Sequence, residues 1–245
     1  MRLDINPTAE INGKRAAKYA ARLLNRTIRR NGEARLLVST GASQFAMFDA
    51  LIKEDVDWTK VEMFHLDEYV GLPYEHPASF RKYLNERFIS HVSLKAAYLV
   101  NDNIPFLTEK IREKQIDVGL IGIGENGHIA FNDPPADFDT DEAYIIVDLD
   151  DKCKMQQVGE GWFENLAAVP KQAISMTVKQ IMSCRHIVSV VPNAVKAEAI
   201  FNTLNKPVSN MVPATILKTH PDWSLFIDYN SAKLIYNAGD ECDCR

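Results

Sequence analysis

The feature that most constrains the fold is the run Ile116-Asp-Val-Gly-Leu-Ile-Gly-Ile123, which is apolar and rich in β-branched residues along most of its length. A strand that is apolar on both faces must be covered on both faces, as in a parallel sheet with helices on either side. The run ends abruptly in polar residues within "GIGENGHIAFNDP". We therefore predict a central strand with a functional loop directly behind it.

Segments with helical and strand periodicity alternate along the rest of the chain. Helices are predicted over 14–30, 43–54, 79–92, 106–115 and 193–204, and strands over 34–40, 61–66, 97–100, 116–124, 143–149, 186–192 and 223–228. This order predicts an α/β fold: a doubly wound, mostly parallel sheet with helices on both faces, a Rossmann-like three-layer sandwich forming a single domain over 1–245. Ligands of such folds bind at the carboxyl ends of the strands.

Composition argues against several classes of partner. The net charge of −5 argues against nucleic acid and anionic membranes, because both need a basic face. The first residues contain no apolar segment typical of a signal peptide, and no apolar run is long enough to span a membrane. We expect a cytoplasmic protein. Its cysteines lack metal-ligand spacing, and Cys242-Asp-Cys244 is expected to be a reduced tail.

The first strand end with candidate chemistry is "STGAS", residues 39–43. Small residues allow backbone N–H groups to approach a ligand, and the following helix N-terminus adds positive potential, which suits a phosphate. The structural alternative is that Ser43 is an N-cap and Gly41 a turn residue.

A pair of acidic residues, Asp67 and Glu68, follows the apolar strand over 61–66. Carboxylates at this position suit general acid–base catalysis. The alternative is that one of them caps a turn, and spacing alone does not decide which one acts.

The glycines of Gly122-Ile-Gly-Glu-Asn-Gly127 match a dinucleotide-binding fingerprint only in spacing. That fingerprint must open a helix, and Pro134 and Pro135 prevent a sustained helix here. We therefore reject a nucleotide site.

What remains in this loop is His128, between the amide of Asn126 and the carboxylate of Asp133. A carboxylate that holds one ring nitrogen fixes the tautomer of a histidine and raises its basicity. We interpret His128 as catalytic, with a structural histidine as the alternative.

The last candidate is Lys196, which Asn193 as an N-cap would place in the first turn of a helix. A cation there opposes the helix dipole, whereas a bound anion would reverse the sign of the interaction. The alternative is a solvated surface lysine.

Together these strand ends indicate a phosphate site, a base and an oriented histidine, without a metal cluster. The sequence predicts proton transfer on a small phosphorylated metabolite.

Five stretches carry a resemblance to a known family: "STGAS", "HLDEYVGLPYEHPASF", "GIGENGHIAFNDP", "VPKQAISM" and "VVPNAVKAEAI". In this order they resemble the glucosamine-6-phosphate deaminase (isomerase) family, within the group that includes 6-phosphogluconolactonase. The second and third stretches are highly specific, "STGAS" is weak, and "GHIAFN" looks like the deaminase branch.

The resemblance implies a reaction in which an amino-sugar 6-phosphate and water give a ketose 6-phosphate (fructose 6-phosphate) and ammonia, without metal or organic cofactor. Asp67, expected to be ionised near neutral pH, would move a proton between C1 and C2. His128 would open the ring, held by Asp133 with Asn126 alongside. Glu68, grouped with the substrate-binding residues, would support the Asp67 loop. The 6-phosphate would contact Ser39, Thr40, Gly41, Ser43 and Lys196.

The sequence departs from the family pattern at four places. The best-known members have an aspartate at Asn126, a glutamate at Asp133 and a second glycine at Ala42. "QQVGEGWFEN" replaces a region that contributes an arginine to the phosphate, and we expect Gln157 or its neighbours to line the site instead.

Alternative functions therefore stay open. The chain could be a 6-phosphogluconolactonase or act on another hexosamine phosphate. The neutral Asn126 and the shorter Asp133 also fit a non-catalytic sugar-phosphate sensor. The expected partner is a small-molecule sugar phosphate, and a homo-oligomer is left open.

The segment after the histidine generates a prediction about regulation. Allosteric members carry basic residues there, but "PADFDTDEAYIIVDLDDK" is acidic and should repel a second sugar phosphate. We expect N-acetylglucosamine 6-phosphate not to activate the protein, so that velocity curves recorded with and without it superimpose. A curve that steepens when the compound is added would contradict this.

Overall fold

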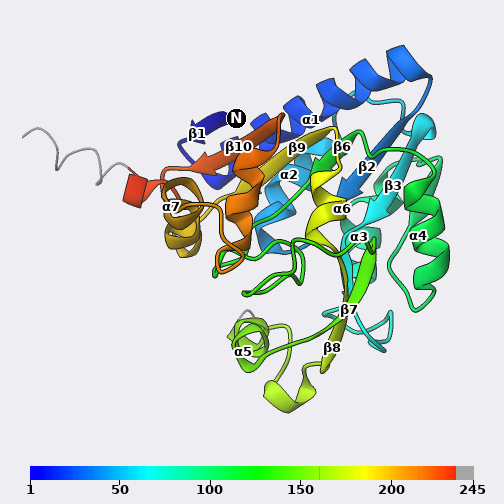
Figure 1. Cartoon of the computed structure of the whole chain (residues 1–245). Coiled ribbons are helices and arrows are strands. Elements are labelled where there is room, and N and C mark those ends of the chain that lie inside the picture. Colours follow the sequence, from blue (N-terminus) through cyan, green and yellow to red (C-terminus); the bar gives the residue numbers. More distant parts are fainter. Residues whose placement is uncertain (160, 236–245) are drawn as a thin grey trace, which may run out of the picture.

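A parallel sheet forms the centre of the molecule (Figure 1). The computed structural model describes residues 1–159 and 161–235, so Cys242 and Cys244 lie outside the described residues. In spatial order the strands are β1 (Arg2–Asn6), β10 (Trp223–Asp228), β9 (His186–Val191), β6 (Val118–Leu120), β2 (Ala34–Val38), β3 (Val61–His65) and β5 (Ala96–Tyr98). All their pairings are parallel. The predicted central strand is confirmed, because β6 lies in the middle of the order.

Helices cover both faces of this sheet, as predicted. The first face carries α1 (Ala9–Asn31), α2 (Phe45–Leu51) and α3 (Phe80–Arg87); the second carries α4 (Ile104–Arg112), α6 (Val178–Met182) and α7 (Ala197–Asn205). Side chains of β2 alternate between the two cores. Leu36 and Val38 belong to the α1 side, and Leu37 belongs to the other. This alternation follows from the two-residue period of a strand and gives the three-layer sandwich.

The longest helix, α1, has clear signals at both ends. Thr8 is its N-cap and accepts a hydrogen bond from the Ile11 backbone N–H over 3.2 Å. Gly32 ends the helix with φ +83°, a left-handed conformation that favours glycine. Between them a stripe of alanines is buried against the sheet. Because the N-cap is Thr8, the helix begins earlier than the predicted residue 14.

A second, smaller sheet corrects part of the prediction. The segment over 143–149 was expected in the main sheet, but β7 (Tyr144–Asp148) pairs antiparallel with β8 (Gln172–Met176), which pairs antiparallel with β4 (Asp67–Tyr69). The exposure of β7 alternates along the strand, typical of an antiparallel strand with one solvated face. This small sheet and α5 (Asp151–Gly159) lie beyond the carboxyl ends of β2 and β3 (Figure 1).

Short 3₁₀ turns join these elements. They are η1 (Ala42–Gln44), η2 (Trp58–Lys60), η3 (Ile89–His91), η4 (Leu166–Ala168), η5 (Ala194–Lys196) and η6 (Pro213–Thr219). Among the described residues, none of the helices is long and apolar enough to cross a membrane.

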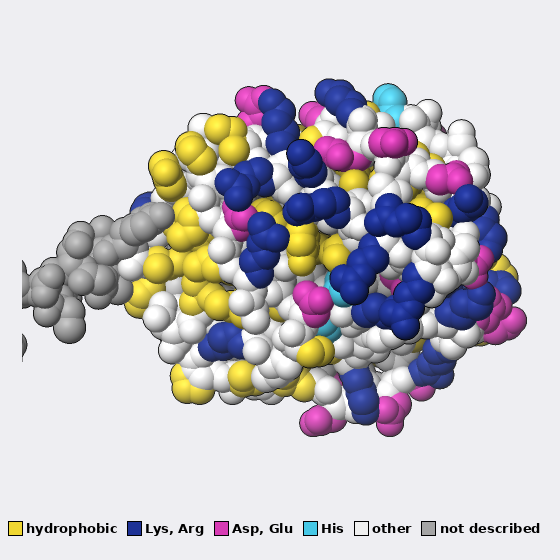
Figure 2. Space-filling model, turned by 90° about the horizontal axis from the view of Figure 1, so that it is seen from above, with side chains coloured by type: hydrophobic (Ala, Val, Ile, Leu, Met, Phe, Trp, Pro, Cys, Tyr) yellow, Lys and Arg dark blue, Asp and Glu magenta, His cyan; other side chains and the backbone are white. Residues whose placement is uncertain are grey.

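The surface over α1 is more basic than the net charge suggests. Figure 2 shows lysine and arginine side chains gathered on this face. The exposed basic residues of α1 are Lys14, Arg15, Lys18, Arg22, Arg26, Arg29 and Arg30. The absence of a nucleic-acid partner, argued from the charge of the whole chain, stays a prediction.

Candidate active site

One cavity of about 540 Å³ lies at the carboxyl ends of the central strands. Its lining contains Ser39, Thr40, Gly41, Ser43, Asp67, His128 and Lys196. These residues follow β2, β3, β6 and β9, so the loops behind four strands converge on one space. The predicted convergence is confirmed. Glu68, Asn126 and Asp133 are not part of the lining.

The loop after β2 lines the cavity and is held in place by hydrogen bonds. Gly41 has φ +108°, where a side chain would be strained, and its carbonyl accepts a hydrogen bond of 3.0 Å from Tyr83 Oη. Ser39 Oγ accepts a 3.1 Å bond from the Gly122 N–H, which joins this loop to the one behind β6. Ser43 makes no capping bond, so its N-cap alternative is wrong. Ala42 also lines the cavity, within η1.

Asp67 and Glu68 point to different surroundings because successive residues of a strand alternate in direction. Asp67 is buried and lines the cavity. The Glu68 carboxylate instead accepts hydrogen bonds from Ser79 Oγ at 3.0 Å and from the Arg81 backbone N–H at 2.9 Å, and it forms an ion pair with the Arg81 side chain at 3.2 Å. Glu68 therefore supports the loop and is not placed to contact a ligand in the cavity, which corrects its grouping with the substrate-binding residues.

The protonation of Asp67 differs from the expectation. Burial, with a smaller contribution from the charge of Glu68, raises the pKa of the Asp67 carboxyl to about 8. The expectation that it is ionised near neutral pH is therefore wrong for the protein without a ligand. A carboxylate with a raised pKa is also a stronger base once it is ionised.

His128 is oriented by the two polar neighbours predicted for it. Its Nδ1 lies 2.7 Å from Asn126 Oδ1 and 3.1 Å from Asp133 Oδ1, and Asn126 Nδ2 donates to the same Asp133 oxygen over 2.9 Å. Because both neighbours of Nδ1 are acceptors, the proton resides on Nδ1 and Nε2 presents its lone pair. The shorter side chain of Asp133 thus still reaches the imidazole.

The glycines of the "GIGENG" loop have a steric purpose. A Cβ on Gly124 would lie 2.1 Å from Cε1 of His128, so the imidazole ring occupies the space over this residue. Gly127 has φ +86°, and a Cβ there would meet Val212. No helix begins directly behind them in the described chain, as predicted. The glycines accommodate the histidine turn and do not form a nucleotide site.

The turn before α7 places Lys196 at the cavity, as predicted, but the turn is held by a hydrogen bond other than the predicted N-cap. Asn193 makes no side-chain capping bond and has φ +81°. Its backbone N–H is held by Asp228 Oδ1 at 3.0 Å. The first turn is the 3₁₀ turn η5, and α7 begins after Lys196.

Part of the lining was not found from the sequence. Phe80, Phe131 and Trp162 form an apolar wall, and Glu125 adds a carboxylate. Gln157, on α5, lines the cavity as expected, and its Oε1 accepts a 2.7 Å bond from Tyr69 Oη. The aromatic spacing after "VGLP" and in "GWF" is a signal, but α5 itself has little amphipathic character and was not predicted.

The cavity thus combines a buried carboxyl, an oriented imidazole and one ammonium group with backbone donors. Among the described residues no group of His, Cys, Asp and Glu could hold a metal ion. The arrangement suits acid–base chemistry on a small anion.

Comparison with known proteins decides the family. Residues 7–225 match the family described as glucosamine-6-phosphate isomerases/6-phosphogluconolactonase. The chain belongs to this family. Glucosamine-6-phosphate deaminases are among its curated relatives: that of Oenococcus oeni is 34% identical over 81% of this chain and 85% of its own length. That of Staphylococcus epidermidis is 34% identical over 89% of this chain and 94% of its own length.

Solved structures of family members have the same fold. A monomeric glucosamine-6-phosphate deaminase superimposes with a TM-score of 0.85 and 28% identity, covering 96% of this chain and 100% of its own. A putative 6-phosphogluconolactonase from Neisseria gonorrhoeae has a TM-score of 0.74, 21% identity and coverage of 93% of this chain and 99% of its own; this likeness shows the fold alone.

The raised pKa of Asp67 generates a prediction about stability. From its ordinary value of 3.8 in the unfolded chain to about 8 in the folded one, the carboxyl binds its proton more tightly when folded. Stability is therefore lost as pH rises from about 4 through 8. We expect Asp67→Asn to become progressively more stable than the wild type over this range, by up to a few kcal/mol in the free energy of unfolding.

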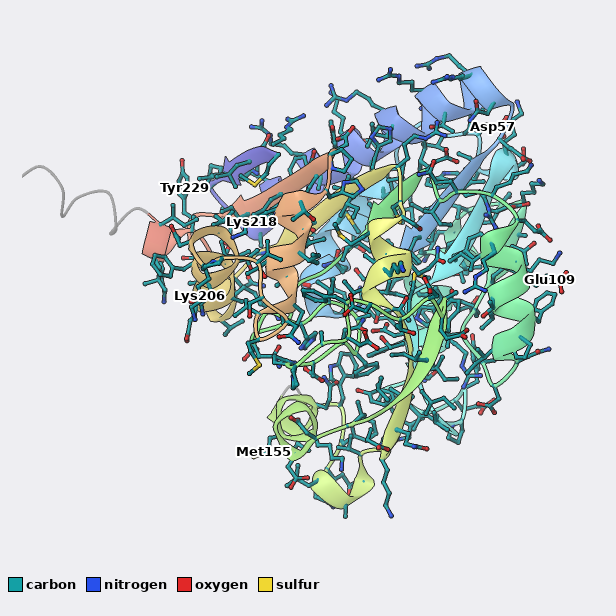
Figure 3. The ribbon with its side chains drawn as sticks, viewed as in Figure 1. Asp57, Glu109, Met155, Lys206, Lys218 and Tyr229 are labelled. Carbon is teal, nitrogen blue, oxygen red and sulfur yellow. The ribbon has the colours of Figure 1, made fainter. Side chains whose placement is uncertain are left out.

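Urea unfolding at a series of pH values measures this difference. The matched control is Asp57→Asn, which changes an exposed carboxylate whose pKa is lowered, chiefly by Thr59 and then by Lys60 (Figure 3). Its difference from the wild type should stay constant between pH 5 and 9. A constant difference for Asp67→Asn as well would contradict the raised pKa.

Proposed function

We propose that this protein is a glucosamine-6-phosphate deaminase, which converts glucosamine 6-phosphate and water to fructose 6-phosphate and ammonia. The observation that carries the proposal is that one cavity joins the Asp67 carboxyl, the His128 imidazole and the Lys196 ammonium group. The relatives named glucosamine-6-phosphate deaminase support the choice of substrate.

The phosphate end of the substrate contacts the loop after β2 and the turn before α7. The backbone N–H groups of Thr40, Gly41 and Ser43 and the hydroxyls of Ser39, Thr40 and Ser43 donate to phosphate oxygens, and Lys196 supplies the positive charge. The Gln157 amide N–H donates beside them, because its oxygen is already engaged by Tyr69. A neutral amide stands where family members supply an arginine.

Ring opening is assigned to His128. Its Nε2 takes the proton of the C1 hydroxyl, and the imidazolium then returns a proton to the ring oxygen as the C1–O5 bond breaks. Asn126 and Asp133 hold Nδ1 so that the charge on the imidazolium is stabilised while it exists.

The isomerisation step is assigned to Asp67. Its carboxylate takes the proton from C2 of the open-chain amino aldehyde and returns it to C1, while a proton passes from the nitrogen to O1, so that an imine forms at C2. Water then adds to this imine and ammonia leaves, which gives the ketose. Because burial raises the pKa of Asp67 to about 8, the protonated form dominates in the ligand-free protein at pH 7, so kcat/KM should rise with pH.

In this proposal the protein is cytoplasmic, and its residues 1–245 act as a single domain on a small-molecule sugar phosphate. The proposed reaction needs no metal, organic cofactor, nucleic acid or membrane. Three alternatives are separated from it by experiment: a lactonase, an enzyme for another hexosamine phosphate, and a non-catalytic sensor. A sensor has no need of a buried base at Asp67, so this residue discriminates between catalysis and sensing.

The test is ammonia release from a panel of hexosamine 6-phosphates, with 6-phosphogluconolactone hydrolysis as the comparison. We expect glucosamine 6-phosphate to be the best substrate. Asp67→Asn should lower kcat by about 10³-fold or more while binding is largely retained, because the base is needed in the transition state. Turnover of the lactone alone would favour the lactonase. No turnover of any hexose phosphate by the wild type would favour the sensor.

A further inference from the structure

The turn that carries Lys196 contains a strained residue. Asn193 has φ +81° and ψ 148°, a backbone region that is almost confined to glycine. Such strain persists only where the surroundings enforce it, and it gathers at functional sites. Asn193, Val195 and Lys196 all line the cavity.

The surroundings that enforce this conformation come from the end of β10. Asp228 is 1% exposed, and its Oδ1 accepts hydrogen bonds from the backbone N–H of Asn193 at 3.0 Å and of Ser231 at 2.8 Å. Its Oδ2 is buried and has no hydrogen-bond partner in the part of the chain that the structure describes. Buried carboxylates are rarely left partly unpaired without a reason.

The constraint passes directly from Asp228 to the lysine. The carbonyl of Asn193 accepts a 3.0 Å hydrogen bond from the Lys196 backbone N–H. The bond to Asp228 and the bond to Lys196 are thus made by the backbone N–H and the backbone carbonyl of one residue, Asn193. The carboxylate therefore fixes the direction in which η5 leaves β9 and enters α7.

The other end of α7 is anchored separately. Lys218 donates to the carbonyls of Leu204 and Lys206 at the C-terminus of the helix (Figure 3). The two ends of α7 are therefore held by different contacts, and the Asp228 bond to Asn193 belongs to the N-terminal end.

We propose that Asp228 is a positioning residue for phosphate: its carboxylate holds Asn193 in the strained conformation that directs Lys196 into the cavity. This inference rests on the proposed function in so far as the cavity binds a phosphorylated substrate. A merely structural role, ending β10 through the Ser231 turn, would affect stability but not phosphate binding.

The experiment measures binding of inorganic phosphate by calorimetry, together with KM and kcat for glucosamine 6-phosphate. We expect Asp228→Ala to weaken phosphate binding and raise KM by about tenfold, with kcat changed less than threefold. Asp228→Asn keeps an acceptor oxygen in the same place and should recover most of the affinity. Adding Asn193→Gly to Asp228→Ala should bring phosphate affinity back to within about threefold of wild type, because glycine adopts this conformation without strain.

The matched control is Asp117→Ala. Asp117 is also a buried carboxylate that accepts a backbone N–H, that of Arg35 at 2.9 Å, but it precedes β6 and so lies at the opposite edge of the sheet. This variant should lose thermal stability and keep its phosphate affinity.

The outcomes separate the two proposals. Four results would each overturn the inference. Two concern the single variants: wild-type phosphate affinity in Asp228→Ala, or equal losses in Asp228→Ala and Asp117→Ala. The other two are failure of Asn193→Gly to restore binding and absence of phosphate binding by the wild type. If Asp228→Ala alone does not fold, the double variant with Asn193→Gly decides in the same way, and a folded double variant that binds phosphate tenfold more weakly would overturn it. Absence of ammonia release together with the expected phosphate pattern would overturn the proposed function alone.

Discussion

The removal of the Asp67 carboxyl from water is the constraint on which the rest of the site depends. Burial disfavours the ionised form, so the pKa rises and the group becomes a stronger base than an exposed aspartate. Its neighbour Glu68 remains buried without disturbing the cavity because Ser79 and Arg81 donate to its Oε2 and the Tyr69 backbone N–H donates to its Oε1. The strand β4 thus places one carboxyl in the cavity and uses the other to secure its own loop.

The small antiparallel sheet joins this base to the histidine loop. Asp67 on β4 lies opposite Ser175 on β8, whose hydroxyl accepts a 3.1 Å hydrogen bond from the Phe131 backbone N–H. Asn132 donates to the Met176 carbonyl on the same strand over 2.8 Å. The loop behind β6 and the loop behind β3 are therefore tied to one strand, so their separation is set by hydrogen bonds and not by flexible side chains.

Much of this arrangement could be predicted from the sequence because it depends on local signals. Runs that are apolar on both faces predicted the parallel sheet, and the polar residues behind those runs predicted Asp67, His128 and Lys196 at one edge. The rule that parallel strands end at the same edge turned separate motifs into one site.

The remainder depends on contacts between distant segments, which one sequence does not reveal. The pairing of β4 with β8 brings together residues more than a hundred positions apart, and it made 143–149 part of a second sheet. The need for glycine at Gly124 arises from the position of the His128 ring. The sequence predicts a capping side chain at Asn193, but this side chain makes no capping bond, and the Asn193 backbone N–H is held by the carboxylate of Asp228 at the end of another strand. The ionisation of Asp67 likewise depends on burial by the folded chain.

The central claim is that the fold keeps the Asp67 carboxyl protonated up to an unusually high pH. The most direct measurement is the carboxyl carbon-13 NMR titration of Asp67, with its resonance assigned by comparison with the Asp67→Asn spectrum. The account predicts a midpoint near pH 8 in the ligand-free protein. A midpoint near pH 4, as for an exposed aspartate, would contradict it.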